Sequence, residues 1–268
     1  MKPIVDYHMH TFLCGHAIGE PFEYADHALK LGLKEIGFSD HAPLVSHDDP
    51  SITMSFEQLP CYHKMLEDLR AQYAEKNLKI KIGIEADYIP GYEEKTQKIL
   101  DGYAYDYVYG SVHFIGEFAF DNPQEKERLK TNNIDKVYLD YHALLRKSAQ
   151  SKLFDIMAHV DLVKKFGDRA KTDLSEEVRK TAEIFKKSEV VIEVNSSGLR
   201  KPVKEIYPAL SELSIYCQAG VMITFGSDAH APAEVGYAFG DALQWAKKAG
   251  YCEYVVFEKR QIVDKIKF

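Results

Sequence analysis

The sequence has few cysteines and no long apolar run, and each absence excludes a class of protein. In a chain of 268 residues the four cysteines, Cys14, Cys61, Cys217 and Cys252, are widely scattered without a C-x-x-C pair. This spacing argues against a disulfide framework and against a cysteine zinc knuckle. No apolar run approaches the roughly 18 residues that a membrane span requires. The N-terminus shows no basic segment followed by an apolar stretch, so we expect a cytoplasmic protein without membrane contact.

Acidic residues outnumber basic residues, and this limits the kinds of binding partner that we expect. With 41 acidic against 34 basic residues, the formal net charge is -7. A broad positive surface for nucleic acid is therefore disfavoured. We expect a small-molecule partner and no nucleic acid, while the sequence leaves the oligomeric state open.

Short apolar runs alternate with helical patterns along the whole chain. Helical periodicity is clear in five segments, which lie near Phe22, Leu66, Val137, Val178 and Ala238. A strand followed by a helix, repeated seven times, predicts an α/β fold with a parallel sheet. No linker interrupts this alternation, so we expect a single domain over residues 1–268, with YVVFE at 254–258 as a candidate for an eighth, irregular strand. The seven strand-like runs are PIVDYH, EIGFSDH, IKIGIEADY, YDYVYGSVH, FDIMAHVD, VVIEVNSS and VMITFGSDAH.

Two connections are too long to be simple turns. They cover residues 42–60 and 114–136, and both follow strand-like runs. Long connections in compact domains are usually functional or mobile. We expect both to lie over the C-terminal face of the sheet.

Histidines and carboxylates stand at the ends of six of the seven strand-like runs. A single histidine in such a place is more often a hydrogen-bonded structural residue. If all of them were structural, however, imidazoles and carboxylates would gather at the face where parallel barrels build active sites, and no group would neutralise or orient them. Coincidence is therefore a poor explanation of the whole set. The residues are His8, His10, His41, Glu85, His113, His159, Asp228 and His230, and His16 follows in the first loop.

This combination of donors predicts a divalent metal centre. Imidazole nitrogen with carboxylate oxygen suits zinc, iron or manganese. His8 and His10 alternate along one strand, so both face the same side. Seven histidines and two carboxylates are too many for one tetrahedral ion and suit two or three, with Glu85 as the natural bridge.

The motifs DYHMHTFLCGHA, FSDHAP, GIEADY, YGSVHF, MAHVDL, VNSSGLRKP and GSDAHAPAEVG resemble the polymerase-and-histidinol-phosphatase (PHP) superfamily, most closely its histidinol-phosphate phosphatase branch. The resemblance implies a distorted (β/α)7, TIM-like barrel with its active site at the C-terminal strand ends. It also implies three ions and hydrolysis of L-histidinol phosphate in histidine biosynthesis. By this resemblance His8, His10, Glu85 and Asp228 hold one ion, Glu85, His113 and His159 a second, and His16, His41 and His230 a third.

Further polar residues near the strand ends are candidates for substrate contact and proton transfer. The guanidinium of Arg200 suits a phosphate group. Asp161 is a candidate general acid or a partner that orients an imidazole. Glu117 and Phe118, on the long fourth loop, are candidates for the substrate's ammonium and imidazole. Asp40 is expected to support a ligand from behind, and Lys164, Lys165 and Lys201 are expected to be solvated.

Three other functions remain open at this point. A PHP-type phosphoesterase or nuclease would use the same ligands on another phosphorylated metabolite or on nucleic acid. A deaminase of the amidohydrolase type would use a similar cluster, often with a modified lysine as the bridge, a role that Glu85 fills here. A metal-binding module without activity would need neither Arg200 nor the long loops.

Overall fold

The computed structural model describes residues 5–268, and a six-stranded parallel sheet forms its centre. The strands follow the order β1-β2-β3-β6-β7-β8 and every neighbouring pair is parallel. Each crossover between neighbouring strands carries helices, as parallel pairing requires. The strands are β1 (Glu35–Phe38), β2 (Lys79–Asp87), β3 (Tyr107–Ser111), β6 (Ile156–Met157), β7 (Val191–Asn195) and β8 (Ile223–Gly226).

The segment 5–10 fills the gap between the two edges of this sheet. Toward β1, the Gly37 amide donates to the Asp6 carbonyl at 2.7 Å. Toward β8, the Tyr7 amide donates to the Phe225 carbonyl at 3.1 Å. The predicted first strand, residues 3–8, is therefore present from residue 5 as a series of isolated bridges, and its first two residues lie outside the described part. With this segment in place the sheet curls into the predicted (β/α)7 barrel.

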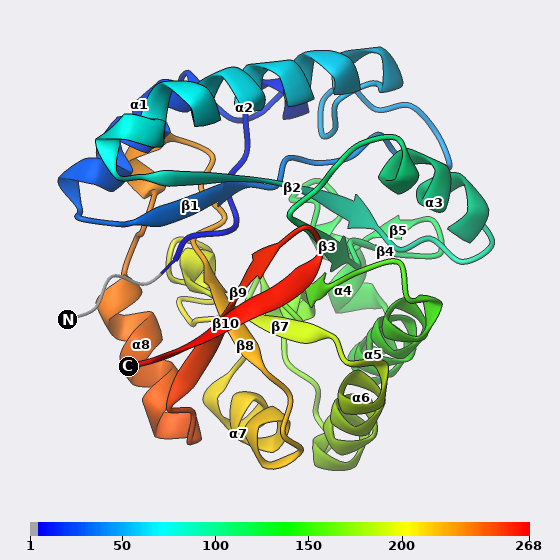
Figure 1. The fold of residues 1–268 in the computed structure, drawn as a ribbon. Coiled ribbons are helices and arrows are strands. Elements are labelled where there is room, and N and C mark those ends of the chain that lie inside the picture. The colour runs from blue at the N-terminus through cyan, green and yellow to red at the C-terminus, as the bar shows by residue number, and fades with distance from the viewer. Residues whose placement is uncertain (1–4) are drawn as a thin grey trace.

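Helices surround the sheet on the outside (Figure 1). The five predicted helical segments correspond to α1, α2, α5, α6 and α8. The sequence patterns did not predict α3, α4 and α7, which are short and bury few apolar side chains. The helices are α1 (Pro21–Lys30), α2 (Leu59–Tyr73), α3 (Glu93–Asp101), α4 (Lys126–Thr131), α5 (Ile134–Ser151), α6 (Ser175–Ser188), α7 (Leu210–Gln218) and α8 (Phe239–Ala249). None of the described helices is long and apolar enough to cross a membrane.

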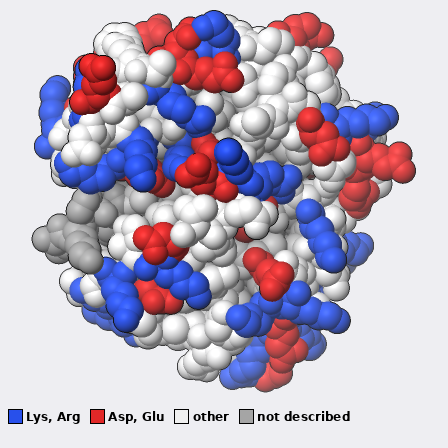
Figure 2. All heavy atoms as spheres, viewed as in Figure 1, with Lys and Arg blue, Asp and Glu red and all other residues white. Residues whose placement is uncertain are grey.

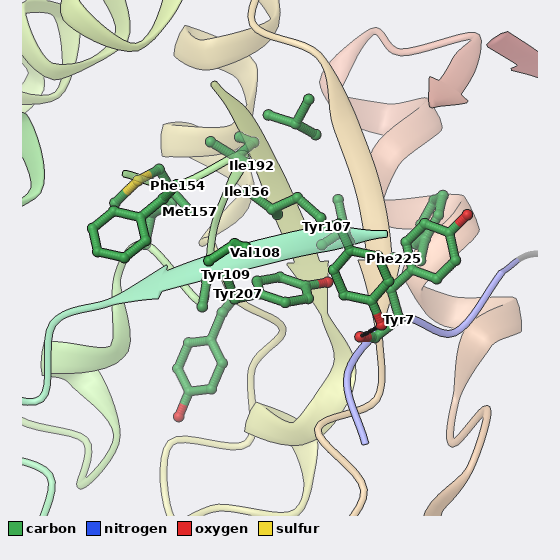
Figure 3. Packing of buried hydrophobic residues seen from close by; sticks show 14 of the residues in the cluster. Tyr7, Tyr107, Val108, Tyr109, Phe154, Ile156, Met157, Ile192, Tyr207 and Phe225 are labelled. Atoms are coloured by element: carbon green, nitrogen blue, oxygen red, sulfur yellow. Dashed lines mark hydrogen bonds between the residues drawn. The ribbon is translucent and has the colours of Figure 1, made fainter. Parts of the chain in front are cut away.

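Aromatic side chains fill the barrel interior (Figure 3). The rings of Tyr7 and Tyr107 stack with centroids 4.7 Å apart, and the Tyr107 hydroxyl donates to the Tyr7 carbonyl at 2.7 Å. Two glycines make room for this ring, since a Cβ at Gly37 or Gly83 would lie 2.1 or 2.2 Å from Tyr107 atoms. A stacked aromatic pair adds about 0.5–1.5 kcal/mol to the gain from burial. A larger residue at either glycine position would expel Tyr107 from the core.

The C-terminal strands β9 (Glu253–Glu258) and β10 (Gln261–Lys267) form an antiparallel hairpin, separate from the barrel sheet. The run YVVFE is thus a strand, as expected, and it lies in this hairpin outside the six-stranded sheet. In Figure 1 the hairpin crosses the centre of the ring of helices. At its turn, Arg260 pairs with Asp155, which directly precedes β6. The hairpin therefore caps the N-terminal end of the barrel, where lysines, arginines and acidic residues are intermixed on the surface (Figure 2).

Candidate metal centre

The nine predicted ligands gather at the C-terminal end of the barrel. Seven of them line a cavity of about 530 Å³. The other two, His8 and His10, are fully buried and contact Glu85 and Asp228 respectively, at 3.1 and 3.3 Å. The predicted long connections lie beside them, since Thr53 and Phe114 line the same cavity. Residues distant in sequence therefore meet at one site, as the strand-end pattern predicts.

Glu85, on β2, stands at the centre of this set. Its Oε2 lies 3.1 Å from His8 Nε2 and 3.1 Å from His41 Nδ1, while its Oε1 lies 3.1 Å from His159 Nε2. The Ser111 hydroxyl also donates to Oε1. One carboxylate thus touches imidazoles from three separate segments, which is the geometry a bridging ligand needs.

The pKa values show that the carboxylates favour positive charge at this site. Burial alone would raise the pKa of Glu85, but His8 and His41 hold it well below its usual range. Burial lowers the pKa of His8, yet Glu193 and Glu85 raise it well above its ordinary value. Bound cations and protons compete for such positions because both satisfy the same negative groups.

The imidazoles of His16 and His230 provide a separate sign of a cation position. Their Nε2 atoms lie 3.0 Å apart. In each ring Nδ1 faces a backbone carbonyl, that of Cys14 for His16 at 2.9 Å and that of Asp228 for His230 at 3.0 Å. Donation from Nδ1 leaves the lone pair of a neutral ring on Nε2. Two such lone pairs repel each other unless they share a cation.

Buried carboxylates hold other imidazoles in place from behind. Glu193, on β7, lies 2.8 Å from His8 Nδ1, and Asp87, at the end of β2, lies 3.0 Å from His113 Nδ1. Such contacts fix the tautomer so that Nε2 is free for a metal. A Cβ at Gly226 would lie 1.9 Å from Glu193 Oε1, so glycine is required there. Sequence reasoning missed both carboxylates, although Glu193 is a charged residue inside an apolar strand-like run.

Two of the predicted ligand residues adopt strained backbone conformations. His159 has φ 24° and Asp228 has φ 52°, values that residues with side chains rarely adopt. The His159 amide donates to Glu193 and its carbonyl accepts from the Tyr141 hydroxyl. Strain of this kind persists only where surrounding contacts enforce it, and it is concentrated at functional sites.

Among residues 5–268, four groups of donors have ligand atoms that all lie within 4.8 Å of one another. One group has the three residues of the predicted third ion, and another contains three of the four predicted for the first. For the second ion the geometry joins His41 to Glu85 and His113, whereas His159 reaches Glu85 alone. The division among ions stays a prediction. The groups are His16, His41 and His230; His8, His10 and Glu85; His41, Glu85 and His113; and His10, Cys14 and His230.

Asp161 does not occupy the position of a general acid. Its carboxylate is buried 2.6 Å from Lys164 Nζ and accepts a hydrogen bond from the Ala209 amide at 2.7 Å. Neither Asp161 nor Lys164 is among the described residues that line the cavity. Burial raises the pKa of Asp161 although Lys164 opposes this. The expected role in proton transfer is corrected to a structural one, which joins the segment after β6 to the start of α7. Lys164, expected to be solvated, is buried as well.

Arg200 lies directly behind Asp228, one of the predicted ligand residues. Its guanidinium donates to the carbonyls of Ser227 and Asp228, both at 2.9 Å, and its Nε lies 3.2 Å from Glu234. Its Nη1 has no hydrogen-bond partner among the described residues. Contact between Arg200 and a phosphate stays a prediction, and the structure adds a second role in holding the backbone at Asp228.

The long fourth connection reaches the cavity through residues other than those expected. Glu117 is exposed at the turn between β4 (Phe114–Ile115) and β5 (Phe118–Ala119). Phe118 is buried beneath the guanidinium of Arg128, 4.6 Å from its ring centroid. In their place Phe114 and Asp121 line the cavity. The turn directs Glu117 and Phe118 elsewhere, so the expected substrate contacts are corrected to other residues of the same segment.

The structure also shows where Asp40 and the two remaining lysines, Lys165 and Lys201, lie. Asp40 lies 3.4 Å from His10 Nδ1 and accepts a hydrogen bond from the backbone amide of Thr11, so it lies behind a predicted ligand, and its supporting role stays a prediction. Lys165 and Lys201, which were expected to be solvated, line the cavity instead. Lys165 pairs there with Asp121 at 3.0 Å.

Comparison with known proteins agrees with this geometry. The PHP domain family matches residues 6–197. A protein named as a probable histidinol-phosphatase from Deinococcus radiodurans is 38% identical over 93% of this chain and 95% of its own length. The histidinol-phosphatase of Bacillus subtilis is 31% identical over 89% of this chain and 98% of its own.

A solved structure supports the fold independently. The histidinol phosphate phosphatase of Lactococcus lactis, in complex with zinc, L-histidinol and phosphate, has a TM-score of 0.81 to this chain. The match covers 97% of this chain and 99% of that one at 22% identity, which establishes the shared architecture. Family match, sequence relatives and fold agree with the resemblance that the strand-end motifs indicated, and the chain belongs to the PHP domain family.

Proposed function

We propose that this chain hydrolyses L-histidinol phosphate to L-histidinol and phosphate in histidine biosynthesis. The observation that carries the proposal is the convergence of seven histidines and two carboxylates around one cavity. The similarity to histidinol-phosphatases over most of the chain supports this substrate. The reaction class is metal-dependent hydrolysis of a phosphate monoester.

We assign two to three divalent ions, zinc, iron or manganese, to the four donor groups of the site. The donor chemistry fits such ions, because imidazoles and carboxylates with inward lone pairs are their usual ligands. Bound ions act as Lewis acids on a phosphoryl oxygen and make a bound water more acidic. Glu85 keeps the donor groups at a fixed spacing, and Glu193 and Asp87 orient two of the imidazoles.

The rest of the cavity wall suits a small zwitterionic phosphate. Lys201 brings positive charge to it. Arg200 is not among the described residues that line the cavity, but its buried Nη1 has no hydrogen-bond partner among them, and we assign this donor to the phosphate. Asp121 stays ionised because Lys165 and His113 hold its pKa low against the effect of burial. We assign the substrate's ammonium to Asp121 and its imidazole to the ring of Phe114, which replace Glu117 and Phe118 in these roles.

Phosphate release from a panel of substrates tests this function. The panel contains histidinol phosphate, several sugar phosphates, an aryl phosphate and a dinucleotide. We expect histidinol phosphate to give the highest kcat/KM, and we expect a chelator to abolish the activity until zinc or manganese is added back. A higher kcat/KM for the dinucleotide would identify a nuclease instead, and full activity of the chelated protein would remove the metals from the reaction.

A further inference from the structure

The thiol of Cys14 lies inside the metal centre. Cys14 is fully buried and carries no disulfide. Its sulfur and a ring nitrogen from each of His10 and His230 all lie within 4.8 Å of one another. His230 also belongs to the group with His16 and His41. The sulfur therefore borders the position that the resemblance assigns to the third ion.

The backbone around Cys14 is held firmly in place. It ends the short helix η1 (Phe12–Cys14), whose first turn is capped by Thr11. The Thr11 amide donates to Asp40 at 3.1 Å. The next residue, Gly15, has φ 81°, and a Cβ there would lie 2.4 Å from the Pro50 carbonyl oxygen. Contacts on both sides therefore hold the backbone that places the sulfur beside the imidazoles.

His10, which the resemblance assigns to the first ion, is the residue next to this sulfur whose buried ring lacks a partner among residues 5–268. Its side chain is fully buried, and neither ring nitrogen has a hydrogen-bond partner among the described residues. Its Nε2 lies 3.3 Å from Asp228, without hydrogen-bond geometry. An unsatisfied buried polar atom destabilises the folded protein. A cation between His10, Cys14 and His230 would satisfy the imidazole and match the nitrogen and sulfur donors that zinc prefers.

We propose that the Cys14 thiolate is a metal ligand shared with His10 and His230, and that it makes the centre select zinc over manganese. Binding converts the thiol and a divalent ion into a metal thiolate and one proton, which is released to water. Soft sulfur favours zinc, whereas carboxylate and water favour manganese. This inference rests on the metal-dependent function proposed above, and it replaces the expectation of a site without cysteine.

Cobalt substitution tests the ligand directly, without reference to turnover. The protein is freed of metal, loaded with Co²⁺ and examined by absorption spectroscopy. We expect a sulfur-to-cobalt charge-transfer band in the near ultraviolet, together with the weaker visible bands of cobalt bound by nitrogen and oxygen. In Cys14→Ser the charge-transfer band should disappear while the visible bands remain.

A matched control uses the other three cysteines. A triple variant with Cys61, Cys217 and Cys252 changed to serine keeps only Cys14, and it should retain the charge-transfer band in full. X-ray absorption of its zinc form should show a sulfur neighbour at about 2.3 Å. This variant leaves the site intact, so it decides the question even where Cys14→Ser fails to fold.

Metal competition tests the selectivity. Zinc and manganese are offered together at equal free concentration, and bound metal is measured. We expect Cys14→Ser to lower the ratio of bound zinc to bound manganese about tenfold or more, the scale on which changes around a metal alter affinity. Visible cobalt bands without a charge-transfer band in the triple variant, or an unchanged metal ratio in Cys14→Ser, would overturn the proposal and leave the metal centre standing. Failure of the native protein to bind Co²⁺ at all would overturn the metal centre as well.

Discussion

The two ends of the barrel bury charged groups in opposite ways. At the N-terminal end, Asp155 accepts hydrogen bonds from Arg260 and from the Val108 amide. Asp106 there pairs with Arg70 and also accepts from a backbone amide. Each carboxylate meets a guanidinium, and its hydrogen-bonding capacity is used within the protein.

At the C-terminal end, the carboxylates meet imidazoles instead. Glu85 contacts three of them, and two imidazole nitrogens face each other across 3.0 Å between His16 and His230. Lys165 and Lys201 line the same cavity, where Lys165 pairs with Asp121. Paired charge at one end stabilises the fold, while converging lone pairs at the other leave an ion to complete the site. Substitutions at the two ends should therefore affect different measurements.

The largest effect is expected for Glu85→Gln at the C-terminal end. An amide cannot supply the negative charge that the surrounding donors share, so both metal content and kcat/KM should fall, the latter by more than about 100-fold. Elemental analysis and phosphate release measure the two quantities. Glu94→Gln, at an exposed position on α3, is the control and should behave as wild type. Normal metal content with a normal rate would exclude Glu85 from the site.

Arg200→Ala should have the next largest effect. Loss of one partner of a buried, hydrogen-bonded charge pair costs about 2–5 kcal/mol, and each 1.36 kcal/mol is about tenfold, so kcat/KM should fall about 30-fold or more. Arg200→Lys should restore only part of this, because an ammonium lacks the planar fork.

The kcat/KM of Arg200→Ala, measured in saturating zinc, separates the two roles of Arg200. If the guanidinium binds phosphate, the loss persists when excess zinc fills the site, and this is the result we expect. Recovery of the wild-type rate in excess zinc would mean that Arg200 serves only to hold the backbone of Ser227 and Asp228. Arg179→Ala, on the exposed face of α6, should change neither metal content nor rate.

Arg260→Ala should affect stability and leave turnover intact. Removal of one partner from a fully buried ion pair costs roughly 3–5 kcal/mol. The Arg260 side chain is 29% exposed and water screens part of the interaction, so we expect a loss of about 2 kcal/mol in the free energy of unfolding. Denaturation in urea measures this loss, with Lys265→Ala in the same hairpin as the control. A fall in kcat of the folded variant would show that the two ends are coupled.

The sequence predicted the C-terminal end far better than the N-terminal end. Ligands at strand ends are recognisable because the alternation of strands and helices places them on one face. The hairpin β9–β10 was missed in part because β10 is mostly exposed and shows no clear apolar alternation. The roles of Asp161 and Phe118 depended on side-chain direction, which a strand-end pattern does not specify. Glu193 was missed because its partner His8 lies far away in the sequence.

The buried carboxylates of Glu212 and Asp161 give the last prediction, an effect on the pH dependence of stability and not on catalysis. Glu212, on α7, has a buried Oε2 without a hydrogen-bond partner among the described residues, and the same holds for Asp161 Oδ1. Burial, followed by the charge of Asp161, raises the pKa of Glu212 to about 8. Lys164, Arg169 and Glu205 complete the set of charges around it. Glu212 is therefore protonated in the folded protein at neutral pH.

Because the pKa of Glu212 is higher in the folded protein than in the unfolded chain, its contribution to stability is complete below about pH 4.5 and is lost as the pH rises to about 8. Glu212→Gln cannot ionise and should remove this dependence. The free energy of unfolding of wild type, relative to the variant, should therefore fall with pH across this window, by at most about 1.4 kcal/mol per pH unit. Urea denaturation at a series of pH values measures the difference, and kcat should be unchanged because Glu212 does not line the cavity among the described residues. A constant difference between the two proteins from pH 5 to pH 8 would mean that Glu212 is ionised in the folded state and that Lys164 or Arg169 neutralises it.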